Sequence, residues 1–565
     1  MSNLSTGCGL TAGSGILLAA INAKWIHPSL ALRLLKANLG PLEQNCTIIE
    51  FALRQPLREK IEPIIESLPR ILGLSVSIWN HTATLELLRE LYRLWVSDNY
   101  QIIDRQLSDN CPSDKRPIIV LGGPEVSYLP HDAEIFRYAD YCIIGEAEVA
   151  FRELCKNILI QKSSNIDGSE ISPLKEKIEN STTIFINRNS QQVNVAAIKS
   201  AYHLYNDEDV HKKLIYVEAS RGCPFGCEFC QSGNSKVREP LVREFPLEPF
   251  LVEMDTLIQR GTHTFKFLDR TFNLNIERAR QIIEFFIKKI EEQSVIKNDP
   301  KPFVVHFEMV PSRFPPELIE TLALFPPDTL RLEIGIQTLN PEVSARISRP
   351  SDPERELATL ALLRQKTSAI IHADLIAGLP GEDMASFGKG FDLLWAALSP
   401  PDTVISDSIP NSITQRRRGA EEDAEPAKYA QNFAPSRLRE KYIEKKQTYV
   451  VPCSVEIQLG ILKLLPGTAI ARHSSAFGMR YNPSPPYEII ETAAFPARDL
   501  DRIKNFARFW ELIINRALPV PFIIDGSPVF DRFMALSDSL LARFGRNWGI
   551  AKNELLEALL DNISR

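Results

Sequence analysis

Three cysteines lie within eight positions of the stretch EASRGCPFGCEFCQSGN, which spans residues 218–234. They are Cys223, Cys227 and Cys230, with the spacing C-x3-C-x2-C. Thiolates are soft ligands that suit zinc and iron–sulfur clusters. A structural zinc site usually takes two close pairs of ligands, and the sequence has no second Cys or His pair nearby. The spacing therefore favours a four-iron cluster in which one iron stays open for a small molecule.

These cysteines belong to a series of βα units that begins at residue 213. Six strand-like segments alternate with helical patterns such as residues 276–292 and 354–366. The strand-like segments are 213–220, 264–269, 303–309, 329–337, 369–380 and 454–462. Such a series predicts a partial (β/α)6 barrel, whose functional residues lie at the carboxyl ends of the strands. The three cysteines follow the first strand and are therefore expected at that end.

An earlier α/β region precedes the barrel. Residues 12–160 alternate apolar runs with amphipathic helical patterns, which predicts a doubly wound parallel sheet of the Rossmann or flavodoxin-like type. The apolar runs end in Asn, Ser or Gly-Gly. These residues let the backbone turn tightly and approach a ligand at the carboxyl edge of the sheet.

The remaining segments complete a predicted domain plan. Residues 161–211 are polar and predict a linker that contains a hairpin at 182–196. The barrel is expected over 212–470, with a disordered insertion at 400–450 that is rich in Pro and charged residues. Residues 471–565 predict a mostly helical C-terminal domain.

Bulk composition indicates a soluble globular chain. Of 565 residues, 44% are hydrophobic and 24% charged, and the net charge of −6 gives no polyanion signal, so a nucleic-acid partner is disfavoured. No apolar run reaches the length of a membrane span. The other six cysteines are scattered, which is typical of a reducing compartment, and a cytoplasmic location is expected.

The cysteine motif, with Phe229 before its last cysteine, resembles that of the radical S-adenosylmethionine (SAM) superfamily. In that family the open iron of a [4Fe–4S] cluster chelates the amino and carboxylate groups of SAM. An electron from the cluster then cleaves SAM to methionine and a 5′-deoxyadenosyl radical. The resemblance implies these two cofactors and a reducing partner such as flavodoxin or ferredoxin.

Other residues resemble SAM contacts of the family, which lie near the strand ends of the barrel. Each has a structural alternative: an acidic residue could begin a helix or form a buried ion pair, an arginine could lie at the surface, and a glycine could form an ordinary turn. The candidates are Phe229, Asp269, Glu308, Glu333, Arg349, Asp374 and Gly378.

The first domain resembles the cobalamin-binding domains of some radical SAM enzymes. Domains of the methionine synthase type carry Asp-x-His-x-x-Gly, Ser-x-Leu and Gly-Gly after successive strands. Ser75-Val-Ser77 and Gly122-Gly123 match the second and third places, but Lys24 replaces the histidine that would ligate cobalt. Many relatives bind cobalamin without this ligand; alternatively, the domain is only a scaffold. The candidate contacts are Asn22, Ser75, Ser77, Trp79, Gly122, Gly123 and Gly145.

Nearly the whole chain is similar to cobalamin-binding radical SAM proteins with a C-terminal domain of the DUF4080 type. The segments that carry this likeness include INAKWIHPSLALRLL, GILKLLPGT and PPYEII. The resemblance implies an enzyme that methylates an unactivated carbon of a small-molecule or peptide substrate; no catalytic residue is identified. The alternatives are a radical oxidoreductase, cyclase or rearrangement enzyme, an RNA methylthiotransferase with further cluster cysteines, or a non-catalytic cobalamin or redox sensor.

Overall fold

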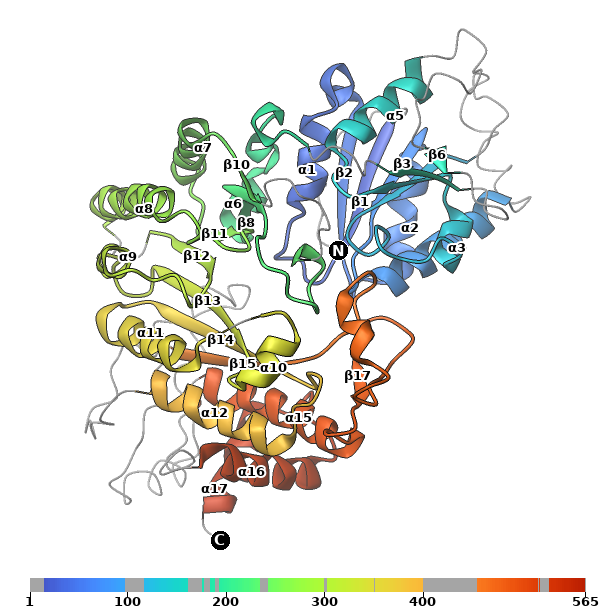
Figure 1. Cartoon of the computed structure of the whole chain (residues 1–565). Helices are drawn as coiled ribbons and strands as arrows, with labels where there is room; N and C mark the ends of the chain where they lie inside the picture. The colour runs from blue at the N-terminus through green and yellow to red at the C-terminus, as the bar shows by residue number, and fades with distance from the viewer. Residues whose placement is uncertain are drawn as a thin grey trace.

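The structure is a computed structural model, and two parallel sheets organise it (Figure 1). Residues 400–450, the predicted insertion, lie outside the described residues. The described residues are 15–96, 116–160, 175–176, 183–187, 193–233, 242–298, 302–349, 351–399, 455–516, 518 and 528–563.

The first sheet has seven strands in the order β2-β1-β3-β4-β5-β7-β6. Its strands are β1 (Ile16–Asn22), β2 (Cys46–Ala52), β3 (Ile71–Ser75), β4 (Ile118–Gly122), β5 (Tyr141–Ile144), β6 (Lys175–Glu176) and β7 (Ile184–Asn187). All neighbours are parallel except β6 and β7. Helices α1 (Leu30–Ala37), α2 (Leu57–Glu66), α3 (His81–Val96) and α5 (Glu148–Ile160) flank the sheet.

Both faces of this sheet are covered by helices. Side chains alternate along β1, so that Leu17 packs in the core under α2 and α3, whereas Leu18 packs in the core under α1 and α5. Two separate apolar cores on one parallel sheet confirm the predicted doubly wound fold.

The segment predicted as a linker contributes strands to this sheet. β7 pairs in parallel with β5, and its antiparallel partner is β6, which precedes it in the chain. The prediction of a hairpin at 182–196 was therefore wrong about the partner of this strand. The alternation of β7 fits a sheet edge as well as a hairpin, so sequence alone did not distinguish the two.

The second sheet has six parallel strands in the order β15-β14-β13-β12-β11-β8. The strands are β8 (Ile215–Val217), β11 (Thr264–Phe267), β12 (Val304–Met309), β13 (Leu330–Gln337), β14 (Ile370–Ala377) and β15 (Val455–Ile461). Because β8 and β15 are edge strands, this is an open (β/α)6 barrel, and each predicted strand is present. Its helices are α6 (Asp207–Lys212), α7 (Leu247–Gln259), α8 (Ile276–Lys297), α9 (Pro316–Leu322), α10 (Pro341–Arg346), α11 (Pro353–Lys366) and α12 (Met384–Leu398).

The C-terminal helices share one apolar core with the barrel. Phe391 of α12 packs edge-on against Trp510 of α15, with ring centroids 4.8 Å apart, and it also contacts Phe530 of α16. These helices therefore extend the outer layer beside β14 and β15 instead of enclosing a core of their own (Figure 1). They are α15 (Ala497–Trp510), α16 (Val529–Phe544) and α17 (Lys552–Ile563).

Short elements connect these layers. Two antiparallel ribbons are formed by β9 (Ser220–Gly222) with β10 (Val242–Glu244) and by β16 (Arg480–Tyr481) with β17 (Ile489–Glu491). The 3-10 helices are η1 (Gly40–Asn45), η2 (Glu134–Tyr138), η3 (Val195–Ala197), η4 (Tyr202–Leu204), η5 (Gln231–Gly233) and η6 (Ala469–His473), and the π-helical turn η7 spans Glu511–Asn515. Within the described residues, no helix combines the length and apolarity needed to cross a membrane.

Candidate functional site

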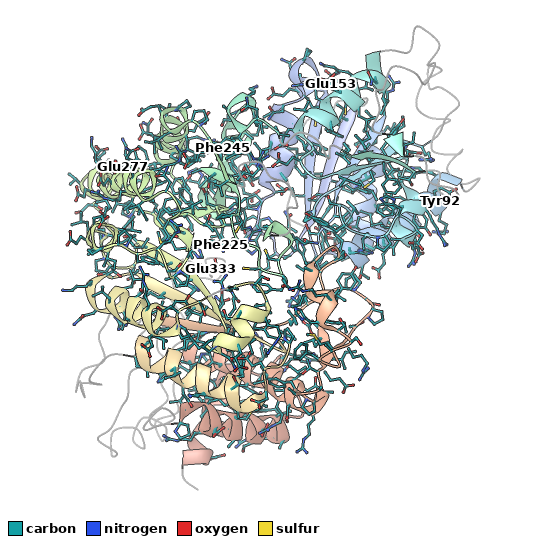
Figure 2. The ribbon with its side chains drawn as sticks, viewed as in Figure 1. Tyr92, Glu153, Phe225, Phe245, Glu277 and Glu333 are labelled. Carbon is teal, nitrogen blue, oxygen red and sulfur yellow. The ribbon has the colours of Figure 1, made fainter. Side chains whose placement is uncertain are left out.

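The three motif cysteines lie on one loop between β9 and η5. All three are free thiols; Cys227 is buried, and Cys223 and Cys230 are half-buried. Arg349 ties this loop to the barrel, because its Nη1 lies 3.5 Å from Cys227 Sγ and its Nη2 donates to the carbonyl of Gly335 at 2.6 Å. Figure 2 labels Phe225 of this loop and Glu333 of β13, both near the centre of the view.

This donor set fits an iron–sulfur cluster. Burial raises the pKa of Cys223, and the neighbouring thiols Cys230 and Cys227 raise it further. Bound iron would supply the positive charge that favours the thiolate form. Across the described part of the chain, no group of three His, Cys, Asp or Glu side chains is placed so that it could hold a single metal ion.

Asp269 supports the start of the cysteine loop. It is 2% exposed, and its two oxygens accept hydrogen bonds from the Ala219 amide at 2.9 Å and the Ser220 hydroxyl at 2.6 Å. Burial raises the pKa of this carboxyl to about 7. Both oxygens thus have partners in the chain itself, which gives Asp269 a positioning role at the start of the loop, and its contact with SAM stays a prediction.

Three predicted acidic residues line the inner face of the barrel. Glu333 is paired: His306 Nε2 and Lys266 Nζ lie 3.2 and 3.1 Å from its Oε2, and they lower its pKa to about 2. Burial and the nearby Glu333 and Glu308 raise the pKa of Asp374 to about 7. Burial also raises the pKa of Glu308, against the opposing effect of Arg270. These carboxyls suit a ligand that carries an ammonium group.

Sequence reasoning missed a histidine pair on the same face. The rings of His306 and His372 stack with centroids 5.5 Å apart, and His372 Nδ1 lies 3.1 Å from Glu456 Oε2. The available signal was the polar alternation within β12, β14 and β15, because strands of a parallel sheet that are covered on both faces are more often continuously apolar.

The two remaining SAM candidates, Gly378 and Phe229, pack closely against neighbouring parts of the chain. Gly378 has φ +88°, and a Cβ there would lie 2.7 Å from Ile489 Cγ2, so both the backbone conformation and the space require glycine. Phe229 is half-buried and packs on the barrel core.

The predicted cobalamin residues gather at the carboxyl edge of the first sheet. Asn22 and Ser75 end β1 and β3, and Gly122 ends β4. Gly123 has φ +112°, and a Cβ there would lie 2.5 Å from the Val76 carbonyl oxygen. Gly145, just past β5, has φ +81° with open space around it.

Some residues at this edge have structural partners. The Ser77 amide donates to Asn80 Oδ1 at 2.7 Å, and Asn22 Nδ2 donates to Glu50 Oε1 at 2.9 Å. His27 Nδ1 lies 2.7 Å from the Tyr216 hydroxyl, and burial followed by Lys24 lowers its pKa. His27 thus belongs to the junction with the barrel.

Large apolar side chains are exposed along this edge. Trp79 is 52% exposed, Trp25 48% and Tyr128 43%, and each follows a different strand of the first sheet. Asn22 and Trp25 also line a cavity of about 400 Å³ beside β2. Exposed aromatic side chains at one sheet edge are suited to cover a flat, largely apolar ligand.

The edge of the first sheet approaches the cysteine loop through Tyr128. Burial raises the pKa of Tyr128, and the charge of the Cys230 thiolate raises it further. Gln231 Nε2, next to Cys230, donates to the Pro466 carbonyl at 3.0 Å, and Gly467 packs against the Tyr128 ring, so the carboxyl ends of both sheets lie near the cysteines.

Comparisons with known proteins agree with this arrangement. Residues 217–394 match the family described as the radical SAM superfamily, whose domain uses a [4Fe–4S] cluster and SAM. The chain is 24% identical over 195 residues to the ribosomal protein uS12 methylthiotransferase RimO of Chlorobium phaeovibrioides, covering 34% of this chain and 43% of that protein. It is 28% identical over 173 residues to an uncharacterized methyltransferase of Pyrococcus horikoshii, covering 29% and 36%. These matches span less than half of each relative.

A solved structure is similar over most of the chain. The cobalamin-dependent S-adenosylmethionine radical enzyme OxsB, with aqua-cobalamin and S-adenosylmethionine bound, aligns with a TM-score of 0.58 at 17% identity. The alignment covers 97% of this chain and 80% of that chain. At this identity the likeness shows the shared fold.

Proposed function

We propose that this radical SAM enzyme, whose radical SAM domain spans residues 217–394, also binds cobalamin on its first sheet and methylates an unactivated carbon. The cluster and SAM would supply the radical, and cobalamin the methyl group. The observation that carries the proposal is that the two sites touch the same short segment: Gln231, next to Cys230, donates from Nε2 to the Pro466 carbonyl at 3.0 Å, and Tyr128, at the carboxyl edge of the first sheet, packs against Gly467. The fold shared with OxsB, which is solved with both small molecules, supports it.

The chain itself would position these groups. Cys223, Cys227 and Cys230 would hold the cluster, with Arg349 donating to Cys227. The carboxyls of Glu308 and Asp374, which resist ionisation when unpaired, would face the ammonium group of SAM. Trp79 and the glycine edge would cover cobalamin, without a protein ligand on cobalt from the first loop, because Lys24 stands there and His27 faces Tyr216.

Other parts of the proposal rest on resemblance. The C-terminal part is assigned to the DUF4080 type on the segments 460–468 and 485–490. The substrate is a small molecule or a peptide, the electron donor resembles flavodoxin or ferredoxin, and the location is cytoplasmic.

The RNA methylthiotransferase alternative needs further cysteines for a second cluster. Burial raises the pKa of Cys46 and of Cys142 to about 12, and it raises that of Cys155 as well. Cys142 packs in the core under α2 and α3, whereas Cys46 and Cys155 pack in the core on the other face of the first sheet, so the three thiols do not share one site.

Anaerobic preparation with iron, sulfide and cobalamin tests the function. Loaded protein should show cluster and corrinoid absorption and should release 5′-deoxyadenosine from SAM when reduced. Cys227→Ala should lose the cluster and the deoxyadenosine but keep the corrinoid bands, whereas the control Cys155→Ala should keep all three. A closed zinc centre at the three thiols would contradict the proposal.

Product mass separates the remaining alternatives. A gain of one methylene unit in the product supports methylation. Loss of hydrogen or isomerisation indicates a radical oxidoreductase, cyclase or rearrangement enzyme. Absence of deoxyadenosine from fully loaded protein indicates a sensor.

A further inference from the structure

Glu228, a buried carboxylate with no role in the candidate site, anchors the cysteine loop. Glu228 is 3% exposed although it lies between Cys227 and Phe229. Its Oε1 accepts from the Ser348 hydroxyl at 2.6 Å and pairs with Arg472, and its Oε2 lies 2.9 Å from His473 Nε2. A buried carboxylate with this many partners fixes its loop strongly to the C-terminal part of the chain.

Main-chain contacts follow the same junction. The Ile470 amide donates to the Glu228 carbonyl at 2.9 Å, and Gln231 Nε2 donates to the Pro466 carbonyl at 3.0 Å. The segment from 466 to 473 therefore lies along the cysteine loop.

The same C-terminal region also contacts the first sheet. The Tyr487 hydroxyl donates to Glu125 Oε1 at 2.6 Å, and Glu125 is 1% exposed in the loop after β4. Gly467 packs against the Tyr128 ring so closely that a Cβ at 467 would lie 2.4 Å from Tyr128 Cδ1. Both contacts reach the loop that carries Gly122 and Gly123.

The two attachment points are joined to each other. The Leu464 amide donates to the Tyr487 carbonyl at 3.0 Å, and Lys463 pairs with Glu488 in an antiparallel bridge. The Ile489 amide donates to the Leu462 carbonyl at 2.8 Å. These hydrogen bonds, together with the backbone from Leu464 to Ile470, form a continuous path from Glu228 to Glu125.

We propose that residues 462–489, the C-terminal bridge, fix the separation between the carboxyl edge of the first sheet and the cysteine loop. Glu228, Glu125 and Tyr487 are its positioning residues. The function of the bridge, to keep a constant distance between cobalamin and the cluster, rests on the proposed function. The physical coupling between the two loops is independent of the proposed function.

Hydrogen exchange of the full-length protein without cofactors tests this coupling. Tyr487→Phe removes one hydroxyl and leaves the buried Glu125 without that donor, so amides of 123–128 should exchange about tenfold faster. The bridge predicts that amides of 228–231, on the other side, also accelerate relative to those of β13. Since coupling is reciprocal, Glu228→Gln should accelerate exchange at 123–128.

A matched control lies in the bridge itself. The Tyr481 hydroxyl donates to Met479 Sδ within the same segment, so Tyr481→Phe should leave both loops unchanged. If either variant accelerates exchange only in the loop that its own substitution contacts, the proposed coupling between residues 123–128 and 228–231 is wrong. This measurement needs no iron, SAM or cobalamin. A failure of cluster assembly would therefore contradict the proposed function without affecting the test of the bridge.

Discussion

At the residue scale, burial decides which groups are available for chemistry. Asp269 and Glu382 are both 2% exposed, and burial raises the pKa of each to about 7. Glu333 has the opposite behaviour, since His306 and Lys266 hold its pKa near 2. The carboxyl groups of this barrel therefore divide into structural acids that prefer a proton and ionised residues that face cations.

Glu382→Gln should change how stability depends on pH. The Thr338 hydroxyl donates to Glu382 Oε1 at 2.6 Å, and burial outweighs this hydrogen bond in setting the raised pKa of the carboxyl. Between pH 5 and 7 the folded state holds a proton that the unfolded state releases, so wild-type stability falls as pH rises. The variant cannot ionise, so its free energy of unfolding relative to wild type should increase from pH 5 to pH 8 by at most about 3 kcal/mol, and its relative thermal midpoint should rise with it.

The exposed Glu320→Gln is the control for this titration, and its relative midpoint should stay constant with pH. If the midpoint of Glu382→Gln relative to wild type also stays constant with pH, then the Glu382 carboxyl ionises in the folded state as it does in the unfolded state.

Trp79→Ala should weaken cobalamin binding without destabilising the apoprotein. The side chain is 52% exposed, so little packing is lost, whereas one aromatic contact to a bound ring contributes up to about tenfold in affinity. Titration of apoprotein with aquacobalamin, followed by absorbance, measures the change. Trp548→Ala, at an aromatic residue that is 68% exposed far along the chain, should bind as wild type does. Equal affinities for the two variants would remove Trp79 from the site.

At the element scale, the strand ends bring the site together. Parallel strands place their carboxyl ends at one edge, which gathers loops after β1, β3, β4 and β5 in the first sheet and the cysteines after β8 in the barrel. The loops after β3 and β4 approach closely at Gly123, because the Val76 amide donates to the Gly122 carbonyl at 2.8 Å and the Glu125 amide donates to the Val76 carbonyl at 3.2 Å.

Gly123→Ala should destabilise this edge strongly. Its φ of +112° is strained for alanine, and the added Cβ would lie 2.5 Å from a backbone oxygen that cannot move away alone. The expected cost is on the order of 3 kcal/mol, measured by urea unfolding. Gly122→Ala is the matched control, since its nearest new contact is an ordinary 3.8 Å to the Ile143 carbonyl. Similar losses in the two variants would contradict the steric account.

At the scale of the whole molecule, charged pairs join the first sheet to the barrel. Arg33 of α1 lies 2.8 Å from Glu50 of β2 and 2.6 Å from Asp209 of α6, and it is 4% exposed. Arg221 of β9 pairs with Glu148 of α5 at 2.8 Å. Together with the C-terminal bridge, these contacts hold the two sheets in one arrangement (Figure 1).

Arg33→Leu should loosen this junction. It removes the cation shared by the buried Asp209 and the half-buried Glu50, and breaking a buried pair costs up to about 3–5 kcal/mol. Asp209 keeps Lys213 at 2.8 Å, so the loss is expected toward the lower end of this range. Thermal unfolding should show a clear loss of stability. The control Arg58→Leu removes an exposed pair with Glu62 and should leave the melting temperature unchanged. If Arg33→Leu melts as the wild type does, the buried cluster contributes no net stability to the junction.

The sequence by itself determined the cysteine motif and the alternation of strands and helices that predicts both parallel sheets. These features depend on spacing along the chain: three thiols on one short loop, and apolar runs that alternate with helical patterns. The glycine positions after β4 and β14 followed from the same local patterns, because a turn needs its residue where it occurs.

Only the tertiary structure decided the partners. Asp269 faces the cysteine loop, β7 joins the first sheet, and Glu228 meets Arg472 and His473, which lie far along the chain. Such pairings depend on which faces pack together, and a side chain of a given type carries no information about a partner hundreds of residues away. The composition of the loop could therefore predict a cluster, but the bridge that positions it emerged only when the chain was folded.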